Sequence, residues 1–428
     1  MKLTILDPGH FHAALVQKSM YADVDAAVDV YAPAGADLDD YLRKIDAYNA
    51  RAQDPTRWRV RAHTGPDYLE RFAADRRGGV AVIAGSNARK TEYLTRAVAA
   101  GYHTLADKPM AIDAEGFAAL EAAFALARER GVLLYDIMTE RHEITTILQK
   151  GFSRILPVFG TLEAGTYDDP AVTKESVHHF SKLVSGAPVK RPAWFFDTAQ
   201  QGEGLVDITT HLVDLVQWEC FPDEALDYRR DVRVLSARRW PTVITPAQFA
   251  QVTALDRFPD FLRKDVQPDG ALHVYANGEI RYALRGVHAK VSVLWNFVAP
   301  AGAGDTHYSV MRGTRANLVI RQGARERWQP TLYIEPHPAQ DRAAYAAAVA
   351  AALPDVQRAY PGIALEPADD GWRVDVPAAY HVGHEAHFAQ VATQFLSCVA
   401  QGRLPDWEVP NMLAKYWTTT RALALARA

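Results

Sequence analysis

Cysteine is almost absent from this chain, and neither sign of charge dominates. Only Cys220 and Cys398 occur among its 428 residues, and no group of cysteines and histidines has the spacing of a zinc finger. Neither a disulfide framework nor a structural zinc site is therefore expected, and so few cysteines suit a reducing compartment, here the cytoplasm. A formal net charge of -4, without a long run of lysine or arginine, argues against a protein that binds nucleic acid.

Long apolar runs are missing as well. No uninterrupted apolar stretch is as long as a membrane span. The chain starts with an apolar strand at residues 2–6 and not with a charged segment before a long apolar one, so no secretory signal is expected. Hydrophobic residues make up 49% of the chain and charged residues 23%, as is typical of globular proteins. Because 428 residues exceed one ordinary core, we expect two domains.

The first part of the chain alternates short apolar runs with amphipathic segments. Strands are predicted at residues 3–6, 27–31, 57–62, 79–84, 103–106 and 132–137, and helices at 11–20, 38–51, 66–75, 88–100 and 113–130. This alternation is typical of βαβ units, in which helices cover both faces of a parallel sheet. The sequence therefore predicts an α/β domain over residues 1–150.

The later part of the chain has a different pattern of apolar segments. Segments rich in β-branched and aromatic residues predict strands at 161–167, 232–240, 271–276, 279–284, 289–295, 307–311 and 317–321. Asn277-Gly278 between two of them indicates a hairpin turn. Helices are predicted at 204–218, 342–352, 382–399 and 411–428. We expect residues 151–428 to form a mostly antiparallel, open-sheet α+β domain for substrate binding and oligomerisation, with a cleft between the two domains.

Asp107-Lys108-Pro109 is the most informative short segment. It directly follows the predicted strand at 103–106, and the carboxyl end of a strand is where α/β sheets bind ligands. Pro109 favours extended backbone before it, which can aim Lys108 at a cleft. The alternative is a surface lysine at a strand end.

The predicted helix at 204–218 carries Asp207, His211 and Asp214 on one face. Polar groups on an otherwise apolar helix need partners, because burying them unpaired would be costly. A polar substrate in a cleft would supply such partners, and so would a network of ion pairs between the domains. A metal ion shared by Asp207 and His211 is a third option.

The turn after the first strand reads Asp7-Pro8-Gly9-His10-Phe11-His12. A dinucleotide-binding fold would place G-x-G-x-x-G here, and this chain has only the middle glycine. Residues 8–12, namely Pro8, Gly9, His10, Phe11 and His12, are nevertheless candidates for cofactor binding. The alternative is a tight turn in which the histidines are caps or surface residues.

Two further segments bear on a cofactor. No acid directly follows the second strand, where it would bind the adenosine ribose, and Asp37 is predicted to cap the next helix. This position therefore favours neither NAD nor NADP. Ser86 and Asn87, after the strand at 79–84, could approach a cofactor ribose, or Asn87 could simply be a helix N-cap.

Carbohydrate sites commonly combine aromatic faces with carboxylates, and several residues offer such groups. The candidates for substrate binding are Glu140, Arg141, Tyr167, Asp168, Trp194 and Asp197, together with Asp207 and His211. His178 and His179, which are predicted in an exposed loop, are candidates as well. His381, His384 and His387 look like metal ligands, but they lie at a predicted helix start, where capping and packing explain them. No metal site is predicted.

In their order along the chain, these features resemble the Gfo/Idh/MocA oxidoreductases, which are named for glucose–fructose oxidoreductase, inositol dehydrogenase and a rhizopine-catabolism protein. The matching segments are Asp107-Lys108-Pro109, Gly202-Glu203-Gly204, Asp207-Ile208-Thr209-Thr210-His211 and Gly313-Thr314. The resemblance implies a Rossmann domain that binds NAD or NADP, with a small preference for NAD, and a homodimer or homotetramer. It also implies that Asp107 and Lys108 lie beside the cofactor, that Lys108 and His211 are catalytic, and that Asp207 orients the site.

Three functions are consistent with this resemblance. The first is oxidation of a sugar, glycoside or polyol hydroxyl, or reduction of the matching ketone. The second is net cleavage of a glycoside by way of transient oxidation with a bound NAD, as some relatives perform it. The third is a sensor of a nucleotide or another ligand, without catalysis. Turnover with catalytic NAD and release of an aglycone would favour the second, and lack of affinity for NAD(H) the third.

Overall fold

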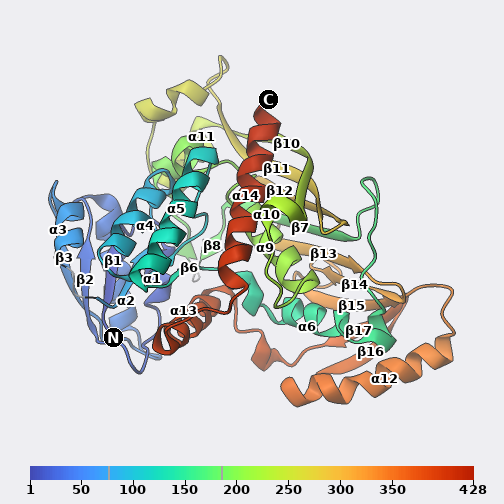
Figure 1. Ribbon diagram of the computed structural model, residues 1–428. Coiled ribbons are helices and arrows are strands. Elements are labelled where there is room, and N and C mark those ends of the chain that lie inside the picture. The colour runs from blue at the N-terminus through green and yellow to red at the C-terminus, as the bar shows by residue number, and fades with distance from the viewer. Residues whose placement is uncertain (76–77, 185–186) are drawn as a thin grey trace.

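Two β-sheets, each covered by helices, form the two halves of the molecule (Figure 1). The computed structural model describes residues 1–75, 78–184 and 187–428. Helix α14 (Glu408–Arg427), red in Figure 1, packs against elements of both halves. Within the described residues, no helix combines the length and the apolar character needed to cross a membrane.

The first sheet has six parallel strands in the order β3-β2-β1-β4-β5-β6, which is a Rossmann-like arrangement. Its strands are β1 (Leu3–Leu6), β2 (Ala27–Tyr31), β3 (Arg59–His63), β4 (Val80–Ile83), β5 (His103–Ala106) and β6 (Leu134–Asp136). The central strands β1 and β4 are buried at every position, because helices cover both faces of a parallel sheet. These helices are α1 (His12–Val16), α2 (Ala36–Ala50), α3 (Tyr68–Ala74), α4 (Lys90–Ala99) and α5 (Ala114–Arg130).

The crossover between β1 and β4 positions the site. β1 pairs with β2 on one side and with β4 on the other, so the chain leaves these neighbouring strands in different directions. Ligands of α/β proteins bind in the crevice that this arrangement opens at the carboxyl ends of the strands. The turn at residues 7–11 follows β1, the short 3-10 helix η1 (Asn87–Arg89) follows β4, and Lys108 follows β5.

The second sheet has nine strands in the order β10-β11-β12-β7-β13-β14-β15-β17-β16. Its strands are β7 (Val172–Ser181), β10 (Val232–Ile244), β11 (Leu272–Leu284), β12 (Val287–Val298), β13 (Thr306–Arg312), β14 (Ala316–Arg321), β15 (Thr331–Pro336), β16 (Ala364–Ala368) and β17 (Gly371–Asp375). Only β12 and β7 pair in parallel; the other pairs are antiparallel. The predicted fold classes of both halves are therefore confirmed.

Helices and a small two-stranded sheet complete the second half. The α-helices are α6 (Ile144–Ser153), α7 (Leu156–Phe159), α8 (Thr198–Gln201), α9 (Thr209–Cys220), α10 (Tyr228–Asp231), α11 (Pro246–Thr253), α12 (Arg342–Ala359) and α13 (His384–Gln401). The 3-10 helices are η2 (Thr139–His142), η3 (Ala193–Phe196), η4 (Asp260–Asp265) and η5 (Ala378–Tyr380), and β8 (Leu183–Val184) pairs with β9 (Ala187–Pro188). Helix α6 spans residue 150, which we predicted as the domain boundary.

The predicted hairpin at Asn277-Gly278 is wrong, because both residues lie inside the continuous strand β11. The neighbouring strand β10 has a register shift between Trp240 and Thr242. The side-chain amide of Asn277 donates to the carbonyl oxygen of Trp240 at 3.2 Å and to the hydroxyl of Thr242 at 2.9 Å, and thus replaces lost ladder bonds. A Cβ at Gly278 would lie 2.5 Å from the Leu205 side chain, so this glycine permits close packing rather than a turn.

Two strand expectations also differ from the structure. Residues 161–167 form only isolated bridges, so they are not the first strand of the second sheet. That strand is β7, and it contains His178 and His179, which we expected in an exposed loop. Strand pairing with β12 therefore fixes both histidines, since His178 lies opposite Trp295 and His179 opposite Asn296.

Two helix starts differ as well. Helix α9 begins at Thr209 rather than at Gly204. A Cβ at Gly204 would lie 2.0 Å from the carbonyl oxygen of Ala276, so the chain passes too close to β11 for a helix there. At α2 the N-cap residue is Gly35, and the Asp37 side chain is used elsewhere, as described below.

A buried ionic network joins the halves beside α14. Arg141 donates to the two carboxylate oxygens of Asp214 at 2.6 and 2.7 Å and to Glu408 at 2.9 Å. Lys415 Nζ lies 2.8 Å from Asp214 and 2.7 Å from Asp136. All five side chains are nearly inaccessible to solvent. Asp214 is therefore part of a structural network, the alternative that the sequence left open.

Removing one partner of this network should destabilise the protein strongly. In Lys415→Met the carboxylates of Asp136 and Asp214 lose a buried cation, and the expected loss in free energy of unfolding is about 3–5 kcal/mol, measured by urea denaturation. Arg358→Ala is the control, since Arg358 pairs with Asp355 at the exposed surface and should change stability by less than about 1 kcal/mol. Equal losses in the two variants would contradict the assignment.

Candidate active site

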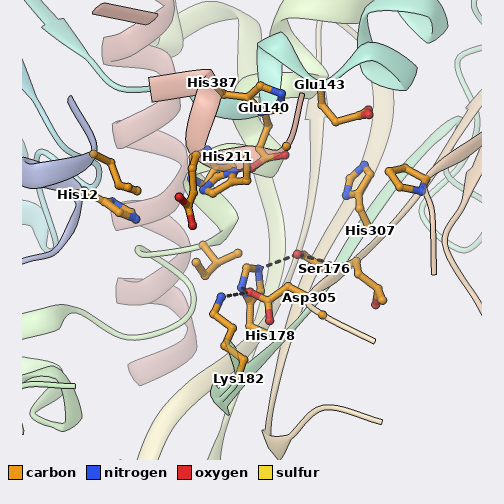
Figure 2. A pocket seen from close by; sticks show the side chains of 18 of the residues that line it. His12, Glu140, Glu143, Ser176, His178, Lys182, His211, Asp305, His307 and His387 are labelled. Carbon is orange, nitrogen blue, oxygen red and sulfur yellow. Dashed lines mark hydrogen bonds and ion pairs between the residues drawn. The ribbon is translucent and has the colours of Figure 1, made fainter. Parts of the chain in front are cut away.

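A cavity of about 580 Å³ lies at the crevice between the two sheets (Figure 2). Residues of the first half line it from the β1 turn and from the ends of β4 and β5. Residues of α9, β7, β13 and the start of α13 line it from the second half. This combination of a large concave space with converging polar groups is typical of a binding site.

Lys108 and Asp207 join the two halves at this cavity. Lys108 Nζ lies 2.6 Å from Asp207 Oδ1, and each side chain is 7% exposed. Gln201 donates to the other oxygen of Asp207 at 3.0 Å. Burial alone would raise the pKa of Asp207, but the charge of Lys108 lowers it below its ordinary value. Asp207 is therefore charged, and its contact with Lys108 fixes both side chains.

His211 follows one turn later on α9 and lines the same cavity. Its Nδ1 is buried and has no hydrogen-bond partner among the described residues. Burial, and next the charge of Lys108, lower the pKa of His211 to about 3. The ring is therefore neutral at neutral pH. Lys108, Asp207 and His211 converge as predicted, whereas their catalytic roles stay predictions.

Two histidines of the β1 turn face the carboxylate that precedes Lys108. His12 Nδ1 lies 3.0 Å from each carboxylate oxygen of Asp107, and His10 Nδ1 lies 3.5 Å from Oδ2. Asp107 is buried, and the two rings are 12% exposed. Burial lowers the pKa of both histidines well below their ordinary value. Phe11 and Asn87 line the cavity beside them.

Acidic groups from η2 and α6 form the adjoining wall. Glu140 lies 3.3 Å from His384 Nδ1; although burial opposes it, nearby histidines hold the pKa of Glu140 below its ordinary value. Glu143 caps α6 by accepting from the amide of Thr146 at 3.0 Å, and burial raises its pKa to about 7. Two carboxylates, one with a lowered pKa and one with a raised pKa, thus face one cavity.

The wall contributed by the second sheet centres on His178 (Figure 2). His178 Nδ1 lies 2.9 Å from Asp305, and Nε2 lies 2.7 Å from the hydroxyl of Ser176. Lys182 also pairs with Asp305. The His178 ring stacks on Trp295 with centroids 5.1 Å apart. An aromatic face beside charged and hydroxyl groups is thereby presented to the cavity.

Comparison with known proteins identifies the family. Residues 148–427 match the family described as "Putative oxidoreductase C terminal domain". A "putative oxidoreductase" from Parabacteroides merdae has 54% sequence identity, with 100% of this chain and 97% of that chain covered and a TM-score of 0.97. The chain therefore belongs to this oxidoreductase family, and its motifs and fold resemble those of the Gfo/Idh/MocA oxidoreductases.

More distant structures share the fold of this oxidoreductase. Levoglucosan dehydrogenase in complex with NADH and L-sorbose has 13% identity and a TM-score of 0.64, with 100% of this chain and 97% of that chain covered. GenD2 from gentamicin A biosynthesis, in complex with NAD, has 15% identity and a TM-score of 0.60, with 100% and 94% covered. No curated protein matches the chain.

The end of the crevice nearest β2 is filled by the oxidoreductase's own side chains. Trp194 of η3 donates from Nε1 to Asp37 Oδ2 at 2.9 Å. A Cβ at Gly9 would lie 3.1 Å from this oxygen and 3.6 Å from the Trp194 ring. The Asn87 side chain, farther along, donates to the carbonyl oxygen of Gln201 at 2.7 Å. Residues 193–201 therefore cover the turn over which a Rossmann fold places a pyrophosphate.

Several predicted site residues consequently do not line the cavity. Pro8, Gly9 and Ser86 are absent from its lining, as is Trp194. Asp197 is the N-cap of α8, and its carboxylate accepts from the Ala199 amide at 3.0 Å. This bond satisfies an amide at the helix start that has no partner within the helix.

Three further assignments to the substrate site are also corrected. Arg141 belongs to the buried ionic network and points away from the cavity lining. Tyr167 and the adjacent Asp168 are exposed, and the Tyr167 hydroxyl lies 2.9 Å from that of Ser236. We expected these two residues at the end of a strand that leads into the site, but their segment is not a strand.

Sequence reasoning missed several residues that the second half supplies. Lys182, Arg191, Asp305 and His307 all line the cavity, but none belongs to a motif. The available signal was the alternation of residues along β7, which ends beside Lys182, and along β13, which begins beside Asp305 and contains His307. It could not be used without knowing that these two strands are neighbours in the sheet.

His211 should make stability depend on pH. Folding lowers its pKa from the ordinary 6.5 to about 3, so between these values the unfolded chain binds more protons than the folded chain, and stability falls with falling pH. The melting temperature of the wild type should therefore drop more between pH 7 and pH 5 than that of His211→Gln, by scanning calorimetry. Parallel curves for the two proteins would contradict the burial of a neutral His211.

Proposed function

We propose that this oxidoreductase interconverts a hydroxyl group and a ketone on a sugar, glycoside or polyol, with a nicotinamide cofactor and NAD in preference to NADP. The observation that carries the proposal is the meeting of Lys108, Asp207 and His211 in one cavity at the carboxyl ends of β4 and β5. Structures of similar fold in complex with NADH and L-sorbose, with NAD, and with NADP+ support it.

The side chains suit proton transfer and charge stabilisation at a substrate oxygen. Neutral His211, whose ring lines the cavity, can accept the hydroxyl proton. The ammonium of Lys108, which Asp207 fixes at 2.6 Å, stabilises the negative charge that develops on that oxygen. In the reverse direction the same proton returns to the alkoxide. Because these groups are buried, their charges act with little screening by water.

The remaining walls suit a polyhydroxylated substrate. Glu140, His178 and Asp305 offer hydrogen-bonding groups, and Trp295 offers an aromatic face. Apolar surface with a few placed polar groups is how small-molecule sites orient their ligands. A sugar or polyol can use both kinds of contact.

The residues near Lys108 fit a nicotinamide, and those at the opposite end fit a dinucleotide only after a rearrangement. A bound nicotinamide would take up or return the hydride of the substrate carbon, and Asn87 and Lys108 would hold that end of the cofactor. At the other end Trp194 and Asp37 occupy the space over Gly9. We therefore propose that residues 193–201 move when the cofactor binds.

Substitution of the two central residues tests the proposal. Lys108→Ala and His211→Ala should each lower turnover by roughly a hundredfold or more, the usual scale for a positioned proton-transfer group. The assay screens sugars and polyols with NAD+ and NADP+ and follows the reduced nicotinamide. Lys44→Ala, on the outer face of α2 and paired with Asp40, is the control. Turnover near that of the wild type in Lys108→Ala and His211→Ala would contradict their assignment.

Product analysis distinguishes oxidation from glycoside cleavage. Reduced cofactor that accumulates in step with a keto product indicates net oxidation. Release of an aglycone with catalytic NAD, and without accumulation of NADH, would replace the proposed reaction by cleavage.

Trp194→Ala should bind NAD+ more tightly than the wild type. The wild type must first break the bond from Trp194 to Asp37, and a competent state that is populated only in part weakens the apparent affinity. Because one such bond contributes about 1 kcal/mol, the dissociation constant measured by calorimetry should fall by roughly fivefold. Trp240→Ala, on the distant strand β10, is the control. Weaker binding to Trp194→Ala would instead make Trp194 a contact of the cofactor.

A further inference from the structure

The turn after β1 presents side chains, rather than free amides, to the cavity. The main-chain amides of Gly9, His10 and Ala13 all donate to main-chain oxygens of the same half, at 2.9–3.1 Å. A phosphate cradle at a helix N-terminus needs such amides to be free. The turn instead places the imidazoles of His10 and His12 beside the carboxylate of Asp107.

The three donors have the spacing of ligands around one ion. Their donor atoms all lie within 4.8 Å of one another. The measured separations from Asp107 are 3.0 Å for His12 and 3.5 Å for His10. Metal–ligand distances of about 2.0–2.2 Å place neighbouring ligands of a tetrahedral ion roughly 3.3–3.5 Å apart. One ion can therefore bind all three with small side-chain adjustments.

We infer that His10, His12 and Asp107 form a binding site for a divalent transition-metal ion, a property beyond the proposed function. Two imidazoles and one carboxylate suit zinc and the neighbouring divalent metals. Three protein ligands leave a position open toward the cavity, as in catalytic metal sites. This inference revises our prediction that the chain has no metal site.

The surroundings hold the ligands in place and compensate nearby charge. The His12 ring packs on Phe388 with centroids 4.6 Å apart. Lys90 donates to the main-chain oxygen of Asp107 at 3.0 Å. This bond fixes the main chain of Asp107 and does not use its carboxylate. The other nearby ammonium, Lys108, is paired with Asp207. The carboxylate of Asp107 can therefore balance part of the charge of a bound ion.

Metal analysis of tag-free protein tests the site without substrate or cofactor, so its outcome is independent of the proposed reaction. The protein is stripped with a chelator and titrated by calorimetry with Zn²⁺, Mn²⁺ or Co²⁺ alone. His12→Ala and the isosteric Asp107→Asn remove ligands. His307→Gln is the matched control, because His307 lines the same cavity on the side away from His12 (Figure 2).

The wild type and His307→Gln should bind one ion per chain. Affinity should fall in His12→Ala and Asp107→Asn by more than roughly tenfold, since even a change behind a ligand costs about that much. Bound Co²⁺ should show visible absorption bands that disappear in both variants. Circular dichroism checks that the stripped variants are folded. If His12→Ala is not folded, the affinity of Asp107→Asn decides the test. Absence of an ion in the wild type, or equal affinity in Asp107→Asn, would overturn the inference.

Discussion

The ion pair between Lys108 and Asp207 is the contact on which the site depends. Lys108 follows β5 in the first half, and Asp207 precedes α9 in the second, yet their charged atoms lie 2.6 Å apart in a buried position. Either charge would be costly to bury alone, whereas together they compensate. The pair therefore fixes how the halves dock. Because His211 lies one turn beyond Asp207, it also fixes the distance between Lys108 and the imidazole that shares the cavity.

The polar face of the segment from Asp207 to Asp214 serves two purposes. Asp207 and His211 face the cavity, whereas Asp214 faces Arg141 and Lys415 in the buried network beside α14. The network pairs three carboxylates with two cations, so it can hold the halves together without using groups of the cavity. The cavity in turn contains a neutral His211. The polar groups of the network and those of the cavity are thereby separated along one segment.

The sequence predicted the elements whose signals are local. β1, β2 and β5 begin and end where their apolar runs do, and Lys108, Asp207 and His211 stand in short motifs. Features that depend on pairing between distant segments were not predictable. Asp305 and His178 meet only because β7 lies beside β13, and Trp194 covers Gly9 only because η3 folds back over the β1 turn. The predicted hairpin at Asn277-Gly278 was wrong because packing against Leu205 outweighs the local preference of these residues for a turn.

A double-mutant cycle on Lys108 and Asp207 tests the central claim most directly. The free energies of unfolding of Lys108→Met, Asp207→Asn and the double variant are compared with that of the wild type. Residues in contact within one buried ion pair couple by about 0.5–3 kcal/mol, and we expect at least about 1 kcal/mol here, because each single change leaves the other group buried without its partner. Losses that add to within about 0.3–0.5 kcal/mol would show that the pair does not hold the halves together, and would contradict the account.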